Sequence, residues 1–245
     1  MSPAIAGATA LRVLTQLRRD PRTVVLLLVV PVALVTLMKY AFAARPQAFQ
    51  LIAGPLLGLF PFITMFLVTS ITMLRERTTG TLERLMTMPL AKLDLLVGYA
   101  IAFAAVATVQ AVAVSTVAFG ALGLDTAGSP AAVIALAVGN AILGMALGLF
   151  VSAFATTEFQ AVQFMPAIVF PQMLLCGLFV ARDQMAAGLR AASDVLPLTY
   201  AYDALDRVTS SGALGTRGAI DVAVVVGATL LALSLGAATL RRRTP

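Results

Sequence analysis

The sequence predicts an all-α membrane protein with six membrane-spanning helices, and three observations support this fold class. First, 60% of the 245 residues are hydrophobic and only 11% are charged, whereas a water-soluble domain of this length needs a more polar surface. Second, apolar runs near the roughly 20 residues that cross a bilayer alternate with short polar joints. Third, the basic residues gather in those joints, which indicates membrane topology rather than a nucleic-acid surface. We therefore expect a lipid bilayer, and no nucleic acid, as a partner.

Residues 3–19 are predicted to form an amphipathic helix that lies at the membrane interface. On a helical wheel, Leu14 and Leu17 share an apolar side, while Arg12 and Arg19 share the polar side. Such a helix can rest flat among the lipid headgroups. The alternative interpretation is a disordered basic leader.

Six apolar runs follow this segment and are the predicted spans: residues 23–43, 52–74, 94–120, 130–155, 160–181 and 219–240. With both termini in the cytoplasm, that side of the membrane carries 11 of the 17 basic residues and five of the 11 acidic ones. The other side then has no net charge. Because basic residues favour the cytoplasmic side, the sequence predicts an even number of spans with both ends inside.

Few polar groups interrupt the predicted spans. Gln110 and Asn140 are expected to hydrogen bond between helices, since a polar side chain at this depth needs a partner. Gly144 and Gly148 have the spacing that favours close contact with a neighbouring helix. Proline residues such as Pro31 are expected to kink their helices.

The rare residue types limit the chemistry of the chain. It has no His and one Cys, so the chain alone supplies neither a zinc site of the Cys/His kind nor a His-based catalytic triad. Cys176 is expected to pack in an apolar segment. An intramembrane enzyme and a proton- or sodium-coupled transporter are both disfavoured, because no acidic residue falls in the middle of a span and the chain has no His.

The connection at residues 75–93 is the most informative joint. Its apolar residues, including Leu82 and Leu85, recur at helical spacing, with Thr81 as a candidate N-cap and Pro89 closing the stretch. A short charged helix with one apolar face is expected to meet either the lipid headgroups or another protein. The pattern alone leaves both options open.

Two stretches resemble the ABC-2 type transporter permeases, and among them the daunorubicin-resistance-type drug export permeases. The first runs Arg75-Glu76-Arg77, Gly80-Thr81-Leu82-Glu83, Leu85, Pro89, Leu95-Leu96 and Gly98. The second runs Phe170-Pro171, Cys176-Gly177-Leu178-Phe179, Leu196-Pro197-Leu198-Thr199-Tyr200-Ala201 and Ala204-Leu205. The sequence departs from the family pattern at Tyr99, where a basic residue is frequent, and at Cys176, where a small residue is frequent.

The resemblance implies a transport subunit of a bacterial-type plasma membrane that is not an enzyme by itself. Two copies of a separate ATPase would bind ATP and Mg²⁺, and a second copy of this chain would complete the exporter. No G-x-x-x-x-G-K-[ST] motif occurs in the 245 residues, and no cofactor is expected in this chain. The loop at 75–93 would be a coupling helix, and the implied ATPase contacts are Arg77, Gly80, Thr81, Leu82, Glu83, Leu85, Pro89 and Glu158.

The resemblance also implies features of the outer side and of the cargo path. The segment 182–217 would form short extracellular re-entrant helices, and its apolar residues make a free surface loop the less favoured alternative. The second and fifth spans would line a path for a drug or antibiotic through Phe60, Phe66, Thr69, Phe164, Phe170 and Met173. A lipid or lipid-linked glycan as cargo fits the same architecture.

Overall fold

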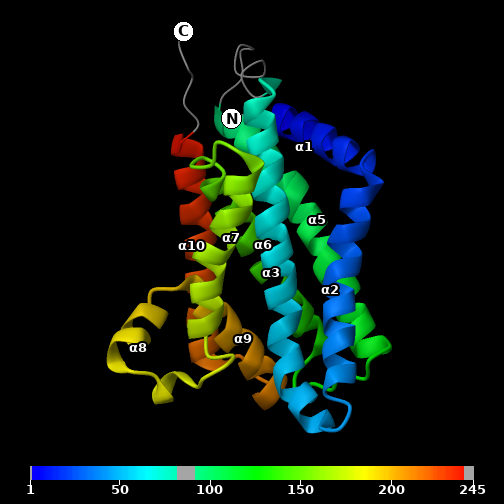
Figure 1. Cartoon of the computed structure of the whole chain (residues 1–245), viewed down its shortest axis with the longest axis vertical. Coiled ribbons are helices and arrows are strands. Elements are labelled where there is room, and N and C mark those ends of the chain that lie inside the picture. The colour runs from blue at the N-terminus through cyan, green and yellow to red at the C-terminus, as the bar shows by residue number, and fades with distance from the viewer. Residues whose placement is uncertain (1, 82–91, 240–245) are drawn as a thin grey trace.

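The computed structural model of the chain describes residues 2–81 and 92–239, and this part is built from α-helices with no strand. The predicted all-α fold class is thus confirmed. Six helices run up and down the long axis of the molecule (Figure 1): α2 (Pro21–Ala41), α3 (Pro46–Thr78), α5 (Lys92–Gly120), α6 (Pro130–Val151), α7 (Glu158–Leu175) and α10 (Gly215–Thr239).

Five of these helices, α2, α3, α5, α6 and α10, are long and apolar enough to cross a membrane. Helix α7 has 18 residues and carries three glutamines, Gln160, Gln163 and Gln172. It lies along α3 in the bundle (Figure 1), where its Val169 is fully buried. The fifth predicted span, 160–181, therefore corresponds to a helix that is shorter than the other five and less apolar over an 18-residue stretch.

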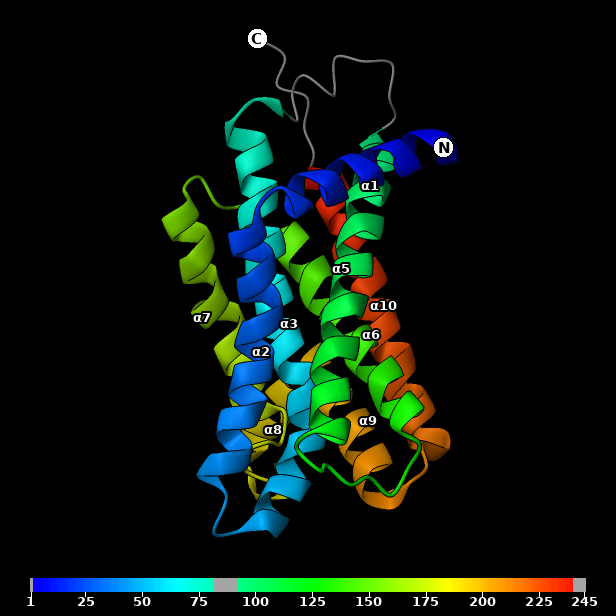
Figure 2. The ribbon, with the colours of Figure 1, turned by 90° about the vertical axis from the view of Figure 1, so that its right-hand side faces the viewer.

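Smaller helices cover the two ends of the bundle. Helix α1 (Pro3–Arg18) lies across the end at which α2 begins and α3 stops (Figure 2), and we call this the α1 end. The opposite end carries the short 3-10 helix η1 (Arg182–Gln184), α8 (Ala187–Ser193) and α9 (Pro197–Ser211), and we call it the α9 end. The described chain enters and leaves the bundle at the α1 end.

Local signals explain where the helices start and stop. Five helices begin on a proline, a residue that suits the first turn because no intrahelical donor is needed there. Asp20 caps α2, since its carboxylate accepts hydrogen bonds from the backbone N–H of Thr23 at 3.3 Å and from its hydroxyl at 2.6 Å. Helix α9 ends at Gly212, which adopts the left-handed conformation with φ of 81°.

The observed helices differ from the predicted spans mainly at their ends. Helix α3 reaches from Pro46 to Thr78, well beyond the apolar run at 52–74. Helix α7 stops at Leu175, and Gly177 just beyond it has φ of 109°. The apolar residues that follow, up to 181, are not helical, and two of them, Phe179 and Val180, are exposed. Hydropathy alone did not distinguish this non-helical stretch from a continuation of the helix.

Helices α3 and α6 pack closely along the centre of the molecule. A Cβ atom added at Gly144 would overlap the backbone carbonyl oxygen of Phe62, and one added at Gly148 would overlap that of Phe66. By contrast, Gly139 on the same helix has open space at that position. The close contact predicted from the glycine spacing is therefore confirmed, and α3 is the partner helix.

Gln110 hydrogen bonds between helices, as predicted. Its buried side-chain amide donates to the carbonyl oxygen of Leu27 at 2.7 Å and to the hydroxyl of Thr64 at 2.5 Å. The Leu27 carbonyl would normally accept from the N–H four residues later, but that residue is Pro31 and has no N–H. Gln110 thus replaces the donor that Pro31 removes from α2.

Asn140 behaves differently from the prediction. Its side chain is buried between α3 and α9, beside Gly58 and Leu205. Within the described residues, its Oδ1 atom has no hydrogen-bond partner. The interhelical hydrogen bond expected of this side chain is therefore not made by its oxygen.

Candidate functional site

The α1 end contains a cluster of polar side chains that joins three helices. Arg12 on α1 forms an ion pair with Glu76 near the end of α3, with a distance of 3.3 Å between Nη1 and Oε1. The same guanidinium donates to the hydroxyl of Tyr99 on α5 and lies 5.5 Å from the centre of its ring. Tyr99 is fully buried and Glu76 is 7% exposed. One arginine on α1 therefore contacts both helices that flank the predicted coupling loop.

Close packing reinforces this attachment of α1 to α5. At Gly98 an added Cβ atom would lie 2.5 Å from the Cβ of Thr9 and 2.8 Å from the carbonyl oxygen of Ala6. At the start of α1, the backbone N–H of Ser2 donates to the carboxylate of Asp94 at 3.1 Å. Helix α1 is thus packed directly on α5, as an ordered helix rather than a disordered leader.

A second ion pair at this end links α3 with the start of α7. Arg75 binds Glu158 through two parallel hydrogen bonds, Nε to Oε1 at 2.7 Å and Nη2 to Oε2 at 3.0 Å. Both side chains are more than half exposed, so solvent screens the pair and its contribution to stability is small. Glu158, predicted as an ATPase contact, therefore lies beside the helix that leads into the predicted coupling loop.

The other predicted coupling residues are only partly described. Gly80 follows α3 with φ of 72°, a left-handed conformation that glycine adopts without strain, and has open space around its Cα. The hydroxyl of Thr81 lies 3.1 Å from that of Thr79. Arg77 is half-buried, and within the described residues its Nε has no hydrogen-bond partner. The remaining predicted residues of this loop, Leu82, Glu83, Leu85 and Pro89, lie outside the described residues.

The predicted cargo-path residues fall into two groups. Phe66 and Thr69 are fully buried where α3 packs on α6, and the Thr69 hydroxyl lies 3.2 Å from the carbonyl oxygen of Met145. They therefore hold the two helices together within one chain. The remaining four are at least partly accessible: Phe60, Phe164, Phe170 and Met173. The most exposed of these is Phe170, at 44%.

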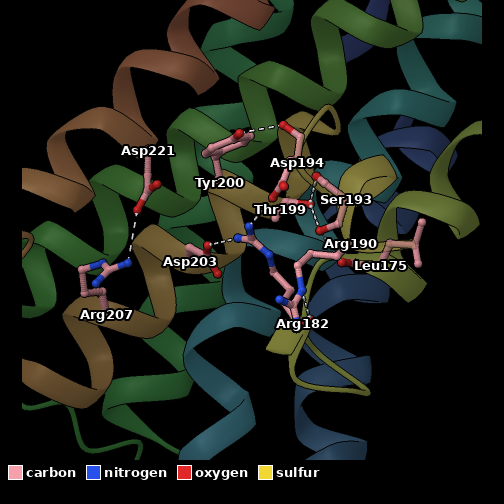
Figure 3. Close-up of polar contacts among 10 residues, drawn as sticks. All are labelled: Leu175, Arg182, Arg190, Ser193, Asp194, Thr199, Tyr200, Asp203, Arg207 and Asp221. Carbon is pink, nitrogen blue, oxygen red and sulfur yellow. Dashed lines mark hydrogen bonds and ion pairs between the residues drawn. The ribbon is translucent and has the colours of Figure 1, made fainter. Parts of the chain in front are cut away.

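An ionic cluster organises the α9 end, as Figure 3 shows. Arg182 lies between two carboxylates, at 2.5 Å from Asp194 through Nη2 and at 2.5 Å from Asp203 through Nη1. Arg190 donates to the carbonyl oxygen of Arg182 at 3.0 Å. A further ion pair, between Arg207 and Asp221 at 3.7 Å, joins α9 to α10. Arg182 thus fastens the loop after α7 to both α8 and α9.

Hydrogen bonds to hydroxyl groups complete this end (Figure 3). The Ser193 hydroxyl donates to the carbonyl oxygen of Leu175 at 2.9 Å, and the Thr199 hydroxyl donates to that of Ser193 at 2.9 Å. Tyr200 donates to the carbonyl oxygen of Asp194 at 2.6 Å. Together these bonds make η1, α8 and α9 a structured cover over the end of α7, in keeping with the prediction of short helices in this segment.

One acid at each end has a shifted pKa, and the two shifts have opposite directions and different causes. Desolvation raises the pKa of Asp203 above its ordinary value, although Arg182 acts in the other direction. By contrast, the side-chain and backbone hydrogen bonds from Thr23 hold the pKa of Asp20 below its usual range. An open cavity of about 490 Å³ adjoins Asp203 and Arg182.

The ion pairs of both ends were not foreseen from the sequence. Arg12 and Glu76 are 64 residues apart, and Arg182 and Asp203 are 21 apart, and no local pattern marks either pair. Within the described residues, no group of three or more His, Cys, Asp or Glu side chains is placed to hold a metal ion.

Known proteins resemble this chain over most of its length. Residues 7–208 match the family described as ABC-2 type transporter. The chain is 28% identical over 148 residues to an Escherichia coli K12 protein named probable multidrug ABC transporter permease YbhR, covering 60% of this chain and 40% of that protein. It is 24% identical over 161 residues to ABC transporter G family member 20 of Dictyostelium discoideum, covering 66% of this chain and 22% of that protein.

The matched regions thus span less than half the length of these relatives. The family match itself covers well over half of the 245 residues and includes most of α1, the connection between α3 and α5, and most of α9. Together with the all-helical bundle and its five apolar helices, it shows that this multi-pass membrane protein belongs to the ABC-2 type transporter family.

Proposed function

We propose that this chain is the permease subunit of an ATP-binding cassette exporter whose ATP and Mg²⁺ are bound by a separate subunit. The family match over residues 7–208 is the observation that carries the proposal. It is supported by the lack of a phosphate-binding G-x-x-x-x-G-K-[ST] motif in the 245 residues. Two ATPase subunits and a second copy of this chain would complete the exporter.

The proposed contact with the ATPase is the connection between α3 and α5. Arg12 ties α1 to both flanking helices through Glu76 and Tyr99, which favours movement of α1 together with the loop. When the ATPases close, a displacement of the loop would pass into α3 and α5 and change which side of the membrane the cargo path faces. The proposed contact residues are Arg77, Gly80, Thr81, Leu82, Glu83, Leu85, Pro89 and Glu158.

We further propose that the α1 end faces the cytoplasm of a cell with a bacterial-type plasma membrane. The described residues near this end include six arginines: Arg12, Arg18, Arg19, Arg22, Arg75 and Arg77. A preference of basic residues for the cytoplasmic side supports this orientation. The α9 end, with its cluster around Arg182, would then face outward.

The proposed cargo is a hydrophobic or amphipathic compound. The name of the Escherichia coli relative, a probable multidrug permease, supports this class. Four predicted residues remain candidate contacts because they are at least partly accessible: Phe60, Phe164, Phe170 and Met173. Phe66 and Thr69 are not included, since both are enclosed between α3 and α6. A lipid or lipid-linked glycan is the second candidate. Stimulation of ATPase activity in the purified complex, measured with drugs and with lipids, distinguishes these classes.

Co-purification tests the proposal directly. We expect the tagged chain, extracted from its host in mild detergent, to bring with it an ATP-binding subunit, and we expect Glu83→Lys to lose that subunit while still inserting into the membrane. Asp125→Lys is the matched control, because it makes the same charge change in the exposed turn between α5 and α6 at the opposite end. Retention by both variants would place the docking surface elsewhere. Absence of any ATPase with the unmodified chain would contradict the exporter proposal.

A further inference from the structure

A groove of about 340 Å³ lies between α2 and α3 in the half of the bundle nearer the α1 end. Its walls are mostly apolar and include Leu26, Val30 and Val68. The polar residues that line it are threonines and Arg75. No residue predicted to line the cargo path belongs to this groove.

The polar and apolar parts of the groove are separated along the membrane axis. Arg75 lies in the last turn of α3, and Thr64 lies 11 residues earlier on the same helix, which corresponds to about 16 Å at the α-helical rise. Val30 marks the deeper part on the α2 side. At the inner end, the Thr64 hydroxyl is occupied by Gln110. The groove is therefore elongated, with its cation at one end, the mouth, and a largely apolar, partly open stretch beyond it.

The mouth of the groove has free donors for an anionic group. Arg75 uses Nε and Nη2 to bind Glu158, and within the described residues nothing occupies its Nη1. Thr72, one turn earlier on α3, also lines the groove, and its hydroxyl makes no hydrogen bond to another described residue. Two acids also lie near Arg75, the exposed Glu158 and the half-buried Asp20, and the hydrogen bonds from Thr23 hold the pKa of Asp20 below its usual range, so its carboxylate stays charged. The mouth therefore offers an anionic headgroup hydrogen-bond donors rather than an excess of positive charge.

We propose that this groove binds a single-chain anionic amphiphile from the leaflet at the α1 end. Its headgroup would meet Arg75 and Thr72, and its acyl chain would lie between α2 and α3 against Val30 and Val68. Ligand pockets range from roughly 300 to 1,000 Å³, and this groove is at the lower limit, which suits one chain better than a two-chain lipid. This amphiphile would be a class of cargo for the proposed exporter. Its role as cargo rests on the proposed function, whereas its binding to the groove does not.

Fluorescence of an engineered tryptophan tests the site, because the chain has no Trp of its own. Leu26→Trp places the reporter on the groove at a position that is 61% exposed. The control is Leu231→Trp on α10, where the original side chain is also 61% exposed. The purified full chain is placed in nanodiscs of zwitterionic lipid and titrated with dodecanoate brominated on its chain. We expect saturable quenching of the Leu26 reporter and only weak, non-saturating quenching of the Leu231 reporter.

The headgroup is tested with matched ligands and variants. Brominated dodecanol and brominated dodecyltrimethylammonium are expected to quench the groove reporter no more than the control reporter. Arg75→Gln in the Leu26→Trp background is expected to weaken dodecanoate binding about tenfold or more, since it removes a charge-assisted hydrogen bond. Arg75→Lys, which keeps the charge, should retain part of the affinity. This second variant keeps the test decisive if Arg75→Gln inserts poorly.

Several results would overturn the proposal. Equal quenching at both reporters would mean that the ligand only partitions into the bilayer. Equal binding of the alcohol or of the cationic amphiphile would exclude the anionic headgroup. Because no ATPase is present, these results do not depend on the exporter proposal. In the complete complex, dodecanoate is expected to stimulate ATP hydrolysis; failure to do so, with groove binding intact, would overturn the cargo role alone.

Discussion

The side-chain amide of Gln110 on α5 donates a hydrogen bond to the backbone carbonyl of Leu27 on α2, at 2.7 Å. Pro31 leaves that carbonyl without its usual helical donor. In a membrane, an unpaired backbone carbonyl is costly because no water is present to replace the donor. A proline in one helix and a glutamine 79 positions later in the chain therefore act as a pair.

Gln110→Leu is expected to reduce the free energy of unfolding by about 1 kcal/mol, the scale of interhelical hydrogen bonds in membranes. The measurement is reversible unfolding of the purified chain in mixed detergent micelles. In a Pro31→Ala background, alanine supplies the missing N–H to Leu27, so the same Gln110 substitution should cost less. Equal costs in both backgrounds would show that Gln110 does not act through the Leu27 carbonyl.

Gly144→Ala is expected to destabilise the bundle by about 1 to 3 kcal/mol, because the new methyl group meets the rigid carbonyl of Phe62 and forces α3 from α6. Gly139→Ala is the control on the same helix, with open space at its Cβ position. This control should be neutral or slightly stabilising, since alanine favours helix more than glycine does. Thermal unfolding of both variants checks the difference, and similar midpoints would contradict the close packing.

Loss of the Arg12 ion pair is expected to loosen α1. Glu76→Gln removes the charge that pairs with Arg12 and leaves Arg12 its contacts with Tyr99 and Gln16, so amide hydrogen exchange in α1 should become faster while exchange in α6 stays unchanged. Arg18→Gln is the matched control, because Arg18 is exposed on the same helix and within the described residues forms no ion pair. If Arg18→Gln loosened α1 as much as Glu76→Gln, the effect would come from membrane electrostatics and not from the pair.

Arg182→Gln is expected to destabilise the cover at the α9 end in a pH-dependent way. Burial raises the pKa of Asp203 and Arg182 opposes that rise, so the variant should raise this pKa further. An acid whose pKa is higher in the folded state than in the unfolded state contributes most to the stability of the fold at a pH below its unfolded-state pKa. This contribution is lost as the pH rises through the folded-state pKa.

The effect of Arg182→Gln should therefore be larger at about pH 8 than at about pH 5. Thermal unfolding at both pH values is the measurement. Arg45→Gln, in the exposed turn at the same end, provides a control that should show no such dependence. A pH-independent loss in Arg182→Gln would mean that Asp194, and not Asp203, is the partner that matters.

The sequence alone determined the elements of this protein that depend on local chemistry. The length of the apolar runs predicted the long helices, because a bilayer requires each spanning helix to satisfy its own backbone hydrogen bonds. The periodicity of polar residues predicted α1, and the spacing of the glycines predicted a close helix contact. The polar side chain of Gln110 within an apolar span indicated an interhelical hydrogen bond. These signals lie within one helix or one turn, so they can be read without knowing the fold.

Only the tertiary structure determined which residues these side chains contact. Nothing near Gln110 in sequence points to Leu27, and nothing near Arg12 points to Glu76, because each pair forms only when distant helices pack together. The same holds for Phe66 and Thr69, whose apolar setting suited a cargo path but which the packing of α6 encloses. Hydropathy specifies that a residue leaves water, whereas only the arrangement of helices specifies whether it then meets lipid, cargo or another side chain.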